Sequence, residues 1–330
     1  MAYRSAAMES ATAFWTVAPG RGELRRETLG APADDQVLVQ ALYSGVSRGS
    51  EALVFHGRVP PSEFQRMRAP FQQGQFPAPV KYGYASVGRV LDGPAALRDA
   101  LVFCLHPHQD RYRVPVSAVH RLPADLPPAR AVLAANLETA VNAVWDAGVQ
   151  PGARVAVIGA GSVGLLAAWT IARIAGCDLQ LIDHNPRRAA VAARLGLPFA
   201  LPEDALPEAG HVLHASGSEA GLRLALRLAG HEACITELSW YGDRIVSLPL
   251  GEAFHSRRLS LRASQVSVVA PSQRGHTTPA QRLSLALSML CDPVLDTVID
   301  SECRFSELPD VMPRILSDSG PVIMHRVRYD

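Results

Sequence analysis

The sequence has 330 residues, of which 48% are hydrophobic and 19% charged, and its formal net charge is +1. This length is sufficient for about two domains, at the usual size of ~150 residues per domain. A net charge near zero supplies no broad positive field for nucleic acid or acidic lipid, and the hydrophobic content excludes a disordered chain.

The cysteines and the apolar segments bear on the compartment. The five cysteines lie far apart and include no C-x-x-C pair, which is typical of reduced thiols rather than of disulfides or a zinc ribbon. Residues 1–26 contain no apolar run of signal-peptide length, and no stretch approaches the ~20 apolar residues needed to span a membrane. We therefore expect a cytoplasmic protein that binds neither nucleic acid nor membrane.

The first third of the chain predicts an irregular, mostly β domain. The run 36–43 is rich in β-forming residues and ends in a turn. Prolines and glycines then punctuate residues 57–94 and leave room for short strands at 85–91 and 101–105. We place this domain at residues 1–125.

After Pro128 the hydrophobic spacing changes to that of helices and buried strands. Residues 131–147 predict a helix that ends at Gly148. Asn185 is expected to cap a further helix, which Pro186 begins and Gly196 closes. Short apolar runs alternate with helical segments, as expected of parallel strands at 155–158, 179–182, 211–215 and 233–238 and of helices at 165–175, 186–195 and 219–229. The alternation predicts a doubly wound parallel sheet over residues 126–294.

A glycine-rich turn directly follows the first of these strands. Its G-x-G-x-x-G pattern opens a helix, whose N-terminal N–H groups favour phosphate. Asp183 ends the next strand about 20 residues further on, where a carboxylate accepts hydrogen bonds from the adenosine ribose. We therefore predict a dinucleotide site, to which the turn contributes Gly159, Ala160, Gly161, Ser162, Val163 and Gly164.

The preferred cofactor depends on Asp183. Its carboxylate repels the 2′-phosphate of NADP, so the sequence favours NAD(H). Arg187 and Arg188 lie close behind it, and their positive charges leave NADP(H) open as the alternative.

Several segments resemble the medium-chain dehydrogenase/reductase superfamily, namely 36–48, 76–88, 137–144, 214–217 and 238–242. The resemblance implies a GroES-like β-rich catalytic domain, completed by residues 295–330, and a Rossmann domain inserted in it. It implies that Arg48 contacts the cofactor pyrophosphate and that Ser216, Gly217 and Ser239 lie in cofactor loops. It also implies a homodimer that pairs edge strands, for which the β-rich run 259–269 is the candidate.

The zinc ligands of the alcohol dehydrogenases in this superfamily are missing. Ser47 stands at the position of the first cysteine, and Tyr84 replaces the histidine of the Gly-His-Glu segment. The third ligand falls on Ala135 or Asn136, and the relay hydroxyl aligns with Gly49. These side chains do not form the N/S tetrahedron that zinc prefers, so we expect a zinc-free member.

Chemistry without zinc requires other polar groups. Lys81 is the only lysine, and a nearby ammonium would lower the pKa of the Tyr84 phenol and make the pair an acid/base couple, provided that Gly83 bends the chain between them. Glu51 is expected to bind substrate or to pair with Arg48.

A second pair of polar residues lies on the helix predicted at 131–147. Glu138 and Asn142 share one face of this helix, four residues apart. We expect this face to look toward the nicotinamide and to contact substrate. The alternative is that these side chains anchor the helix.

The leading hypothesis is a zinc-independent, NAD(H)-dependent oxidoreductase that interconverts an alcohol and a carbonyl. Segments 45–51 and 82–88 are most similar to the branch containing the bacteriochlorophyllide side-chain dehydrogenase, which implies a flat heterocyclic or tetrapyrrole substrate. Two alternatives remain: an NADPH-dependent reductase of quinone or enone C=C bonds, and a catalytically degenerate dinucleotide sensor or subunit.

Overall fold

The computed structural model describes residues 9–317 and 322–330, and it divides the chain into two compact units. The first unit comprises Met1–Leu133 and Ser301–Asp330, and the second comprises Ala134–Asp300. The second unit begins later than the expected residue 126, because the short helix α2 (Pro128–Ala131) contacts strands β3 and β6 of the first unit. Residues 1–8 and 318–321 of the predicted first domain lie outside the described residues.

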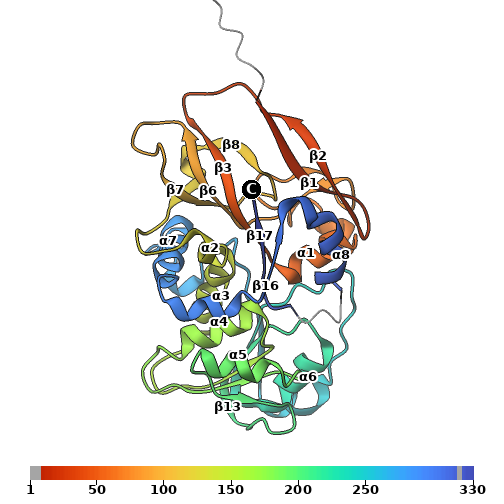
Figure 1. Cartoon of the computed structure of the whole chain (residues 1–330). Coiled ribbons are helices and arrows are strands. Elements are labelled where there is room, and N and C mark those ends of the chain that lie inside the picture. Colours follow the sequence, from red (N-terminus) through yellow and green to blue (C-terminus); the bar gives the residue numbers. More distant parts are fainter. Residues whose placement is uncertain (1–8, 318–321) are drawn as a thin grey trace, which may run out of the picture. The chain divides into compact units, whose positions relative to one another are not determined.

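Two sheets form the first unit (Figure 1). The smaller sheet has the order β2 (Arg21–Thr28), β1 (Ser10–Ala18), β5 (Val80–Lys81), β4 (Gln73–Gly74). The larger sheet has the order β16 (Ser301–Arg304), β17 (His325–Arg328), β3 (Gln36–Val46), β6 (Ser86–Asp92), β7 (Leu101–Cys104), β9 (Val119–Arg121), and β8 (Arg111–Pro115) also pairs with β3. The last residues of the chain are therefore built into the same sheet as β3.

The core of the first unit follows from the alternation along these strands. In β3, Val37, Val39 and Ala41 are buried together with side chains from β6, β7 and β8. The helices α1 (Arg48–Phe55) and α8 (Leu308–Ile315) close this core with their apolar faces. The strand expected at 36–43 continues to Val46 in the structure, and α1 begins at Arg48 directly after it.

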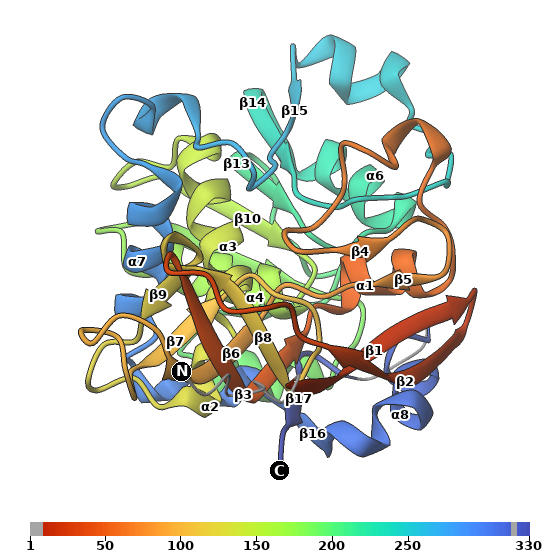
Figure 2. The ribbon, with the colours of Figure 1, turned by 90° about the horizontal axis from the view of Figure 1, so that it is seen from above.

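The second unit contains one parallel sheet, as predicted. Its strands have the order β12 (Phe199–Ala200), β11 (Asp178–Ile182), β10 (Arg154–Ile158), β13 (Ala209–His214), β14 (Ala229–Glu237), β15 (Ser260–Ala263). Its helices are α3 (Ala134–Ala147), α4 (Ser162–Ile171), α5 (Arg188–Arg194), α6 (Glu219–Leu228) and α7 (Pro279–Met289). Figure 2 shows α3 and α6 on opposite sides of β10 and β13, so both faces of the sheet are covered and its central strands are apolar throughout.

The direction in which the sheet grows reverses between β10 and β13. The chain runs from β10 outward to β11 and β12, and it then returns to place β13 on the other side of β10. Ile158 pairs with His214 where these two strands end. In open parallel sheets a ligand binds outside the carboxyl ends of the strands at such a reversal.

Several element boundaries of the second unit differ from the prediction. The helix expected from Pro186 begins at Arg188 in the structure, because the Asn185 side chain accepts the N–H of Arg187 and forms a turn before the helix. In the run 259–269, only Ser260–Ala263 is a strand.

Short helical turns complete the connections, namely η1 (Pro61–Glu63), η2 (Val116–Ala118), η3 (Leu250–Phe254), η4 (Pro271–Gln273), η5 (Pro293–Val298) and η6 (Phe305–Glu307). Within the described ranges, no helix combines the length and apolarity needed to cross a membrane.

Candidate functional site

The glycine-rich turn between β10 and α4 forms an open cradle. A Cβ on Gly159 (φ +106°) would lie 2.6 Å from the Ser216 nitrogen, and one on Gly164 would lie 1.8 Å from the Gly159 oxygen. Around Gly161, by contrast, no atom lies within 4 Å of the corresponding position. Gly161 is the N-cap of α4, and the first N–H groups of a helix have no partner inside it. The two outer glycines thus allow close packing, and the central one leaves space in front of the anion-binding end of α4.

Asp183 is fixed beside this cradle. Its Oδ2 accepts the Ala160 N–H at 2.7 Å, and its Oδ1 accepts the Asn185 N–H at 2.8 Å. Each carboxylate oxygen retains a further lone pair, so the carboxylate can still accept hydrogen bonds from ribose hydroxyls. Nη1 of Arg188 lies 3.9 Å from Oδ2 of Asp300, and the Arg188 side chain is only 11% exposed.

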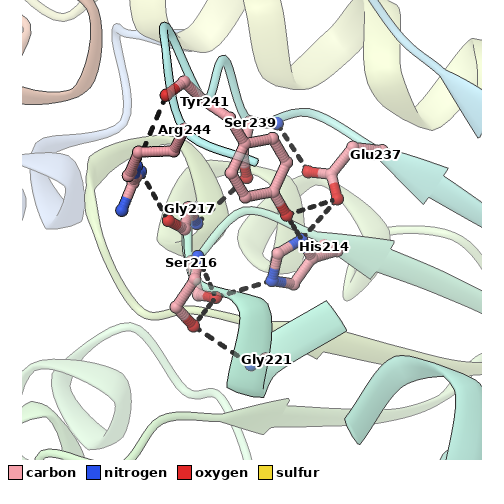
Figure 3. Close-up of polar contacts among 9 residues, drawn as sticks. His214, Ser216, Gly217, Gly221, Glu237, Ser239, Tyr241 and Arg244 are labelled. Carbon is pink, nitrogen blue, oxygen red and sulfur yellow. Dashed lines mark hydrogen bonds and ion pairs between the residues drawn. The ribbon is translucent and has the colours of Figure 1, made fainter. Parts of the chain in front are cut away.

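The loops after β13 and β14 are joined by a polar cluster (Figure 3). His214 ends β13, and its Nδ1 lies 2.7 Å from Oε2 of Glu237, which ends β14. Tyr241 donates to the same oxygen at 3.0 Å, and the Ser239 N–H donates to the other carboxylate oxygen at 2.7 Å. Burial and Glu237 raise the pKa of the Tyr241 phenol, which therefore stays protonated and acts as the donor.

The predicted loop residues lie within this cluster. The Ser216 hydroxyl bonds His214 Nε2 at 2.6 Å, and the Gly217 N–H donates to the Ser239 hydroxyl at 3.0 Å. Arg244 donates to the Gly217 carbonyl at 2.8 Å. Sequence reasoning placed Ser216, Gly217 and Ser239 in these loops but missed His214 as a structural link; the available signal was a polar residue at the end of a buried parallel strand.

The first unit contains a second group of polar residues where β3 ends. Ser47 is the N-cap of α1, and Tyr84 follows Gly83, whose φ of +126° reorients the chain after β5. The Tyr84 phenol forms hydrogen bonds with the side chains of Ser47 and Ser50. Burial, reinforced by the carboxylate of Glu51, raises the pKa of Tyr84 to about 12. At neutral pH the phenol is therefore a proton donor.

The expected coupling of Lys81 with Tyr84 is wrong. Lys81 is 1% exposed, and its Nζ donates to Glu27 at 2.7 Å and to Gln109 at 2.8 Å. Burial lowers the pKa of Lys81, while the pKa of Tyr84 is raised instead of lowered. The physical reason is that the ammonium is committed to a carboxylate on β2, whereas the phenol faces two hydroxyls and an acid.

Glu51 is buried, with 3% exposure, and it is held from two sides. Its Oε1 accepts the Ser47 N–H at 2.7 Å, and its Oε2 lies 2.9 Å from Nε2 of His108. The expected partner, Arg48, donates to the Ser317 carbonyl at 2.6 Å. Sequence reasoning therefore missed His108.

Glu138 and Asn142 lie on one face of α3, and that face is occupied by Arg282 of α7. The guanidinium donates to Glu138 Oε1 at 3.1 Å and also to Asn142 Oδ1, and all three side chains are buried. This placement fits the alternative in which the two residues anchor the helix. Sequence reasoning gave no role to Arg282, because its partners lie far away along the chain.

The chain's own donors do not fit a zinc ion. Ser47 and Tyr84 offer only hydroxyl groups, whereas zinc prefers thiolate, imidazole and carboxylate ligands. Across residues 9–317 and 322–330, no three His, Cys, Asp or Glu side chains are grouped so as to hold a metal.

Comparisons with known proteins agree with this architecture. Residues 155–213 match the model of the ketopantoate reductase PanE/ApbA family. Over 144 residues the chain is 32% identical to L-threonine 3-dehydrogenase of Bacillus velezensis, which covers 42% of this chain and 41% of that enzyme. The structure of L-idonate 5-dehydrogenase from Escherichia coli superposes with a TM-score of 0.80 at 14% identity, covering 98% of this chain and 99% of the other.

A further structure, described as the short chain alcohol dehydrogenase rspB of Escherichia coli CFT073 complexed with NADH, superposes with a TM-score of 0.75 at 13% identity, covering 97% of this chain and 99% of the other. The chain has the medium-chain dehydrogenase fold. In sequence, it spans about two fifths of the length of the curated relative described above. The medium-chain dehydrogenase fold accounts for both the β-rich first unit and the parallel sheet of the second.

Proposed function

We propose that this protein is an NAD(H)-dependent oxidoreductase that interconverts an alcohol and a carbonyl without a metal ion. The observation that carries the proposal is the cradle at Gly161, open in front of α4 and flanked by the Asp183 carboxylate. When bound there, NADH supplies a hydride. The chain itself must bind the pyrophosphate at α4, hold the ribose, and move one proton.

Preference for NAD(H) over NADP(H) is supported by charge. We expect the Asp183 carboxylate to hold the adenosine ribose, and its negative charge would then repel a 2′-phosphate on that ribose. Of the two arginines behind Asp183, Arg188 lies 3.9 Å from Asp300, whereas Arg187 is exposed and keeps NADP(H) as the alternative.

Tyr84 is our proposed proton donor to the substrate oxygen. The residue is partly exposed, its phenol is protonated at neutral pH, and hydrogen bonds with Ser47 and Ser50 orient the phenol. In reduction, the phenolic proton passes to the oxygen while the carbonyl carbon receives the hydride. This arrangement replaces the Lewis acid that zinc provides in other enzymes.

A flat substrate is supported by a row of aromatic rings in the first unit. The centroids of Phe64 and Phe76 are 5.8 Å apart, those of Phe76 and Tyr82 are 5.9 Å apart, and those of Tyr82 and Tyr84 are 5.9 Å apart. Phe76 and Tyr82 are buried, so Phe64 and Tyr84, the partly exposed ends of the row, are the rings that a planar molecule would contact. Together with the resemblance of segments 45–51 and 82–88, this favours a side-chain carbonyl on a heterocycle or tetrapyrrole.

The proposal includes a homodimer. All four residues of the edge strand β15 (Ser260–Ala263) are exposed, and only one side of this strand is paired within the sheet. An open edge of this kind can pair with the same strand of a second copy. Sedimentation of the purified protein at twice the monomer mass would support this part, and a monomer at micromolar concentration would refute it.

The decisive experiment is deuterium tracing. The purified protein is incubated with NADH deuterated separately on each face of the nicotinamide, together with an extract of polar and pigment metabolites. A product that gains one deuterium at an alcohol carbon supports the proposal, and deuterium at a former C=C bond favours the enone reductase instead. Binding of NADH without any labelled product would favour the degenerate sensor.

Asp183→Ala provides the matched cofactor control. We expect weaker NADH binding and a relative gain for NADPH, because the variant removes both the ribose acceptor and the charge that repels phosphate. Glu203→Ala removes a carboxylate elsewhere in the second unit and should change the affinity for neither NADH nor NADPH. If Asp183→Ala binds both cofactors like the wild type, the cradle is not the cofactor site.

A further inference from the structure

Three side chains of the polar cluster in Figure 3 form a row that ends at the surface of the second unit. Oε2 of Glu237 lies 2.7 Å from Nδ1 of His214, and Nε2 of the same imidazole lies 2.6 Å from Oγ of Ser216. We call Glu237, His214 and Ser216 the triad. The His214 side chain is fully buried, whereas Ser216 is exposed. The serine is therefore the member of the triad that an outside molecule can reach.

The hydrogen positions within the triad follow from the charge of Glu237. An ionised carboxylate can only accept, so the proton of a neutral His214 imidazole lies on Nδ1. The Tyr241 hydroxyl is farther from Nδ1, at 3.4 Å, and donates to the carboxylate. Nε2 is then an acceptor, and the Ser216 hydroxyl donates to it. This is the order of a nucleophile, its general base and the group that orients the base.

The base and its acid are held in place by the sheet. His214 and Glu237 end the neighbouring strands β13 and β14, and they pair directly with each other across these strands. Tyr241 donates to one carboxylate oxygen at 3.0 Å, and the Ser239 N–H donates to the other at 2.7 Å. With both of its oxygens fixed, the carboxylate keeps Nε2 of the imidazole directed at the serine.

Gly221, in the first turn of α6, leaves the space that the triad occupies. A Cβ at this position would lie 2.2 Å from Oγ of Ser216 and 2.6 Å from Nε2 of His214. A glycine inside a helix costs about 0.5–1 kcal/mol relative to alanine. The helix alone would therefore be better served by alanine, and it is the contact between Ser216 and His214 that requires glycine.

Ser218 stabilises the charge that develops on the Ser216 oxygen as it loses its proton. The Ser218 N–H lies 3.3 Å from this oxygen, and the Ser218 hydroxyl lies 2.8 Å from it. Because the Ser216 proton is directed at His214, the Ser218 hydroxyl is the donor in this contact. Ser218 is also the N-cap of α6, and the N-terminal end of a helix favours negative charge.

We propose that Ser216 is an activated nucleophile and that the triad hydrolyses activated carboxylic esters. Esters of acidic alcohols are the class that fits, because their leaving groups depart without strong stabilisation of the carbonyl oxygen. This activity goes beyond the oxidoreductase function and does not depend on it.

The reaction has two steps, and water is its only co-reactant. In the first step, Oγ of Ser216 bonds to the carbonyl carbon and the ester C–O bond breaks. The alcohol leaves with the proton that His214 has taken from Oγ. In the second step, Nε2 takes a proton from water, the oxygen of this water attacks the acyl carbon, and Oγ recovers a proton as the acid leaves. Nδ1 keeps its proton throughout, so the imidazole returns to its starting tautomer after each turnover.

The first unit contains a buried row of the same three groups, which serves as an internal comparison. Oγ of Ser44 lies 2.7 Å from Nδ1 of His108, and Nε2 of that imidazole lies 2.9 Å from Oε2 of Glu51. Ser44 has 0% exposure, so an ester in solution cannot reach it. The two serines thus have similar partners and differ in access.

The test treats the purified full-length protein with a fluorophosphonate probe, whose phosphorus bonds to the oxygen of an activated serine while fluoride leaves. No dinucleotide is added, because the triad lies beside the cradle: a Cβ on Gly159 would be 2.6 Å from the Ser216 nitrogen. We expect an adduct that tandem mass spectrometry maps to Ser216 and not to Ser44. Turnover is measured with p-nitrophenyl acetate, as release of p-nitrophenolate.

Glu237→Gln tests the role of the acid without changing its shape. The Ser239 N–H holds the amide oxygen at the Oε1 position, so the amide nitrogen faces Nδ1 of His214 and donates to it. The imidazole proton then lies on Nε2 and blocks transfer from the serine. We expect labelling and turnover to fall by about 10²–10⁴-fold, as for the wrong tautomer in other triads.

Two serine variants complete the experiment. Ser216→Ala should abolish both the adduct and the turnover. Ser288→Ala removes another exposed serine of the second unit, whose hydroxyl donates to the Leu285 carbonyl, and should keep wild-type rates.

A wild-type protein whose Ser216 stays unlabelled overturns the proposal, and this result does not depend on the folding of any variant. Labelling of Glu237→Gln at the wild-type rate also overturns it, because the base would then act without its acid. Failure of the deuterium tracing refutes the oxidoreductase function and leaves the triad to be decided by the probe.

Discussion

Replacing Arg282 by methionine should destabilise the second unit more than any surface substitution in it. The guanidinium is 2% exposed, and it donates to Glu138, to Asn142 and to the carbonyls of Val266 and Val268. Methionine keeps much of the volume but none of the donors. The Glu138 carboxylate would then be buried without a counter-charge.

The expected cost is about 3–5 kcal/mol, the range for removing one partner of a buried ion pair. For a unit of this size, that cost corresponds to a fall in Tm of about 6–20 °C. Arg154→Met is the matched control, because Arg154 pairs with Asp178 at 3.2 Å while 55% exposed, and a surface pair contributes about 0–1 kcal/mol. Adding Glu138→Leu to Arg282→Met should recover most of the loss, since no charge is then left buried.

The stability lost in Arg282→Met should also depend on pH. Burial already raises the pKa of Glu138 against the opposing effect of Arg282, and without the cation it rises further. A carboxyl whose pKa is raised in the folded state stabilises that state, relative to neutral pH, as long as the pH is below its unfolded pKa, where it is uncharged. This stability is lost as pH rises through the folded pKa and the buried group ionises. The variant should therefore be closer to the wild type at acidic pH than at pH 8.

Urea unfolding measures these free energies, with Trp145 and Trp169 as fluorescent reporters that both lie in the second unit. A cost for Arg282→Met no larger than that for Arg154→Met would refute the reasoning. So would a double variant that is less stable than Arg282→Met alone, because it would show that Glu138 tolerates burial without a partner.

The remaining predictions concern single side chains. Gly164→Ala should prevent stable folding, because its Cβ would lie 1.8 Å from a backbone oxygen, and calorimetry would show the loss. Gly161→Ala should leave Tm within about 1 °C by calorimetry but weaken NADH binding in a fluorescence titration. Tyr84→Phe should lower kcat by about 10²–10⁴-fold at unchanged Tm, and Tyr82→Phe should not; equal losses would contradict the role of Tyr84. Lys81→Met should reduce stability, since it leaves a carboxylate without its partner, but should keep the pH profile of turnover; a shifted profile would return Lys81 to the chemistry.

Local patterns predicted the second unit well. The apolar run of β10, the glycine spacing behind it and the carboxylate at the end of β11 all lie within about 30 residues, the length of one strand–helix–strand unit. The hairpin of β1 and β2 escaped prediction because the sequence of β2, Arg21–Thr28, is largely polar, and its pairing with β1 is what makes it a strand. The helix α1 escaped for a related reason: the Glu51 side chain that folds back onto the Ser47 N–H is a contact that spacing alone does not reveal.

The site of the first unit was predicted only in part. The sequence singled out Ser47 and Tyr84, which the resemblance places at the positions of zinc ligands, and the structure joins their two hydroxyls by a hydrogen bond. The role expected of Lys81 was wrong because three residues of separation do not determine which way a strand side chain points once Gly83 takes a φ of +126°. The partner that claims Lys81, Glu27, lies on a strand that the sequence did not predict.

Charge burial connects these findings. Three ionisable residues singled out from the sequence, Glu51, Lys81 and Glu138, are each buried beside a partner at least 50 positions away in the chain. For Lys81 and Glu138 that partner is an opposite charge, which offsets desolvation and leaves nothing for a substrate. Glu51 differs, because its partner is an imidazole that leads on through hydroxyls to a solvent-lined groove. We therefore assign the Lys81 and Glu138 pairs to stability and not to substrate binding.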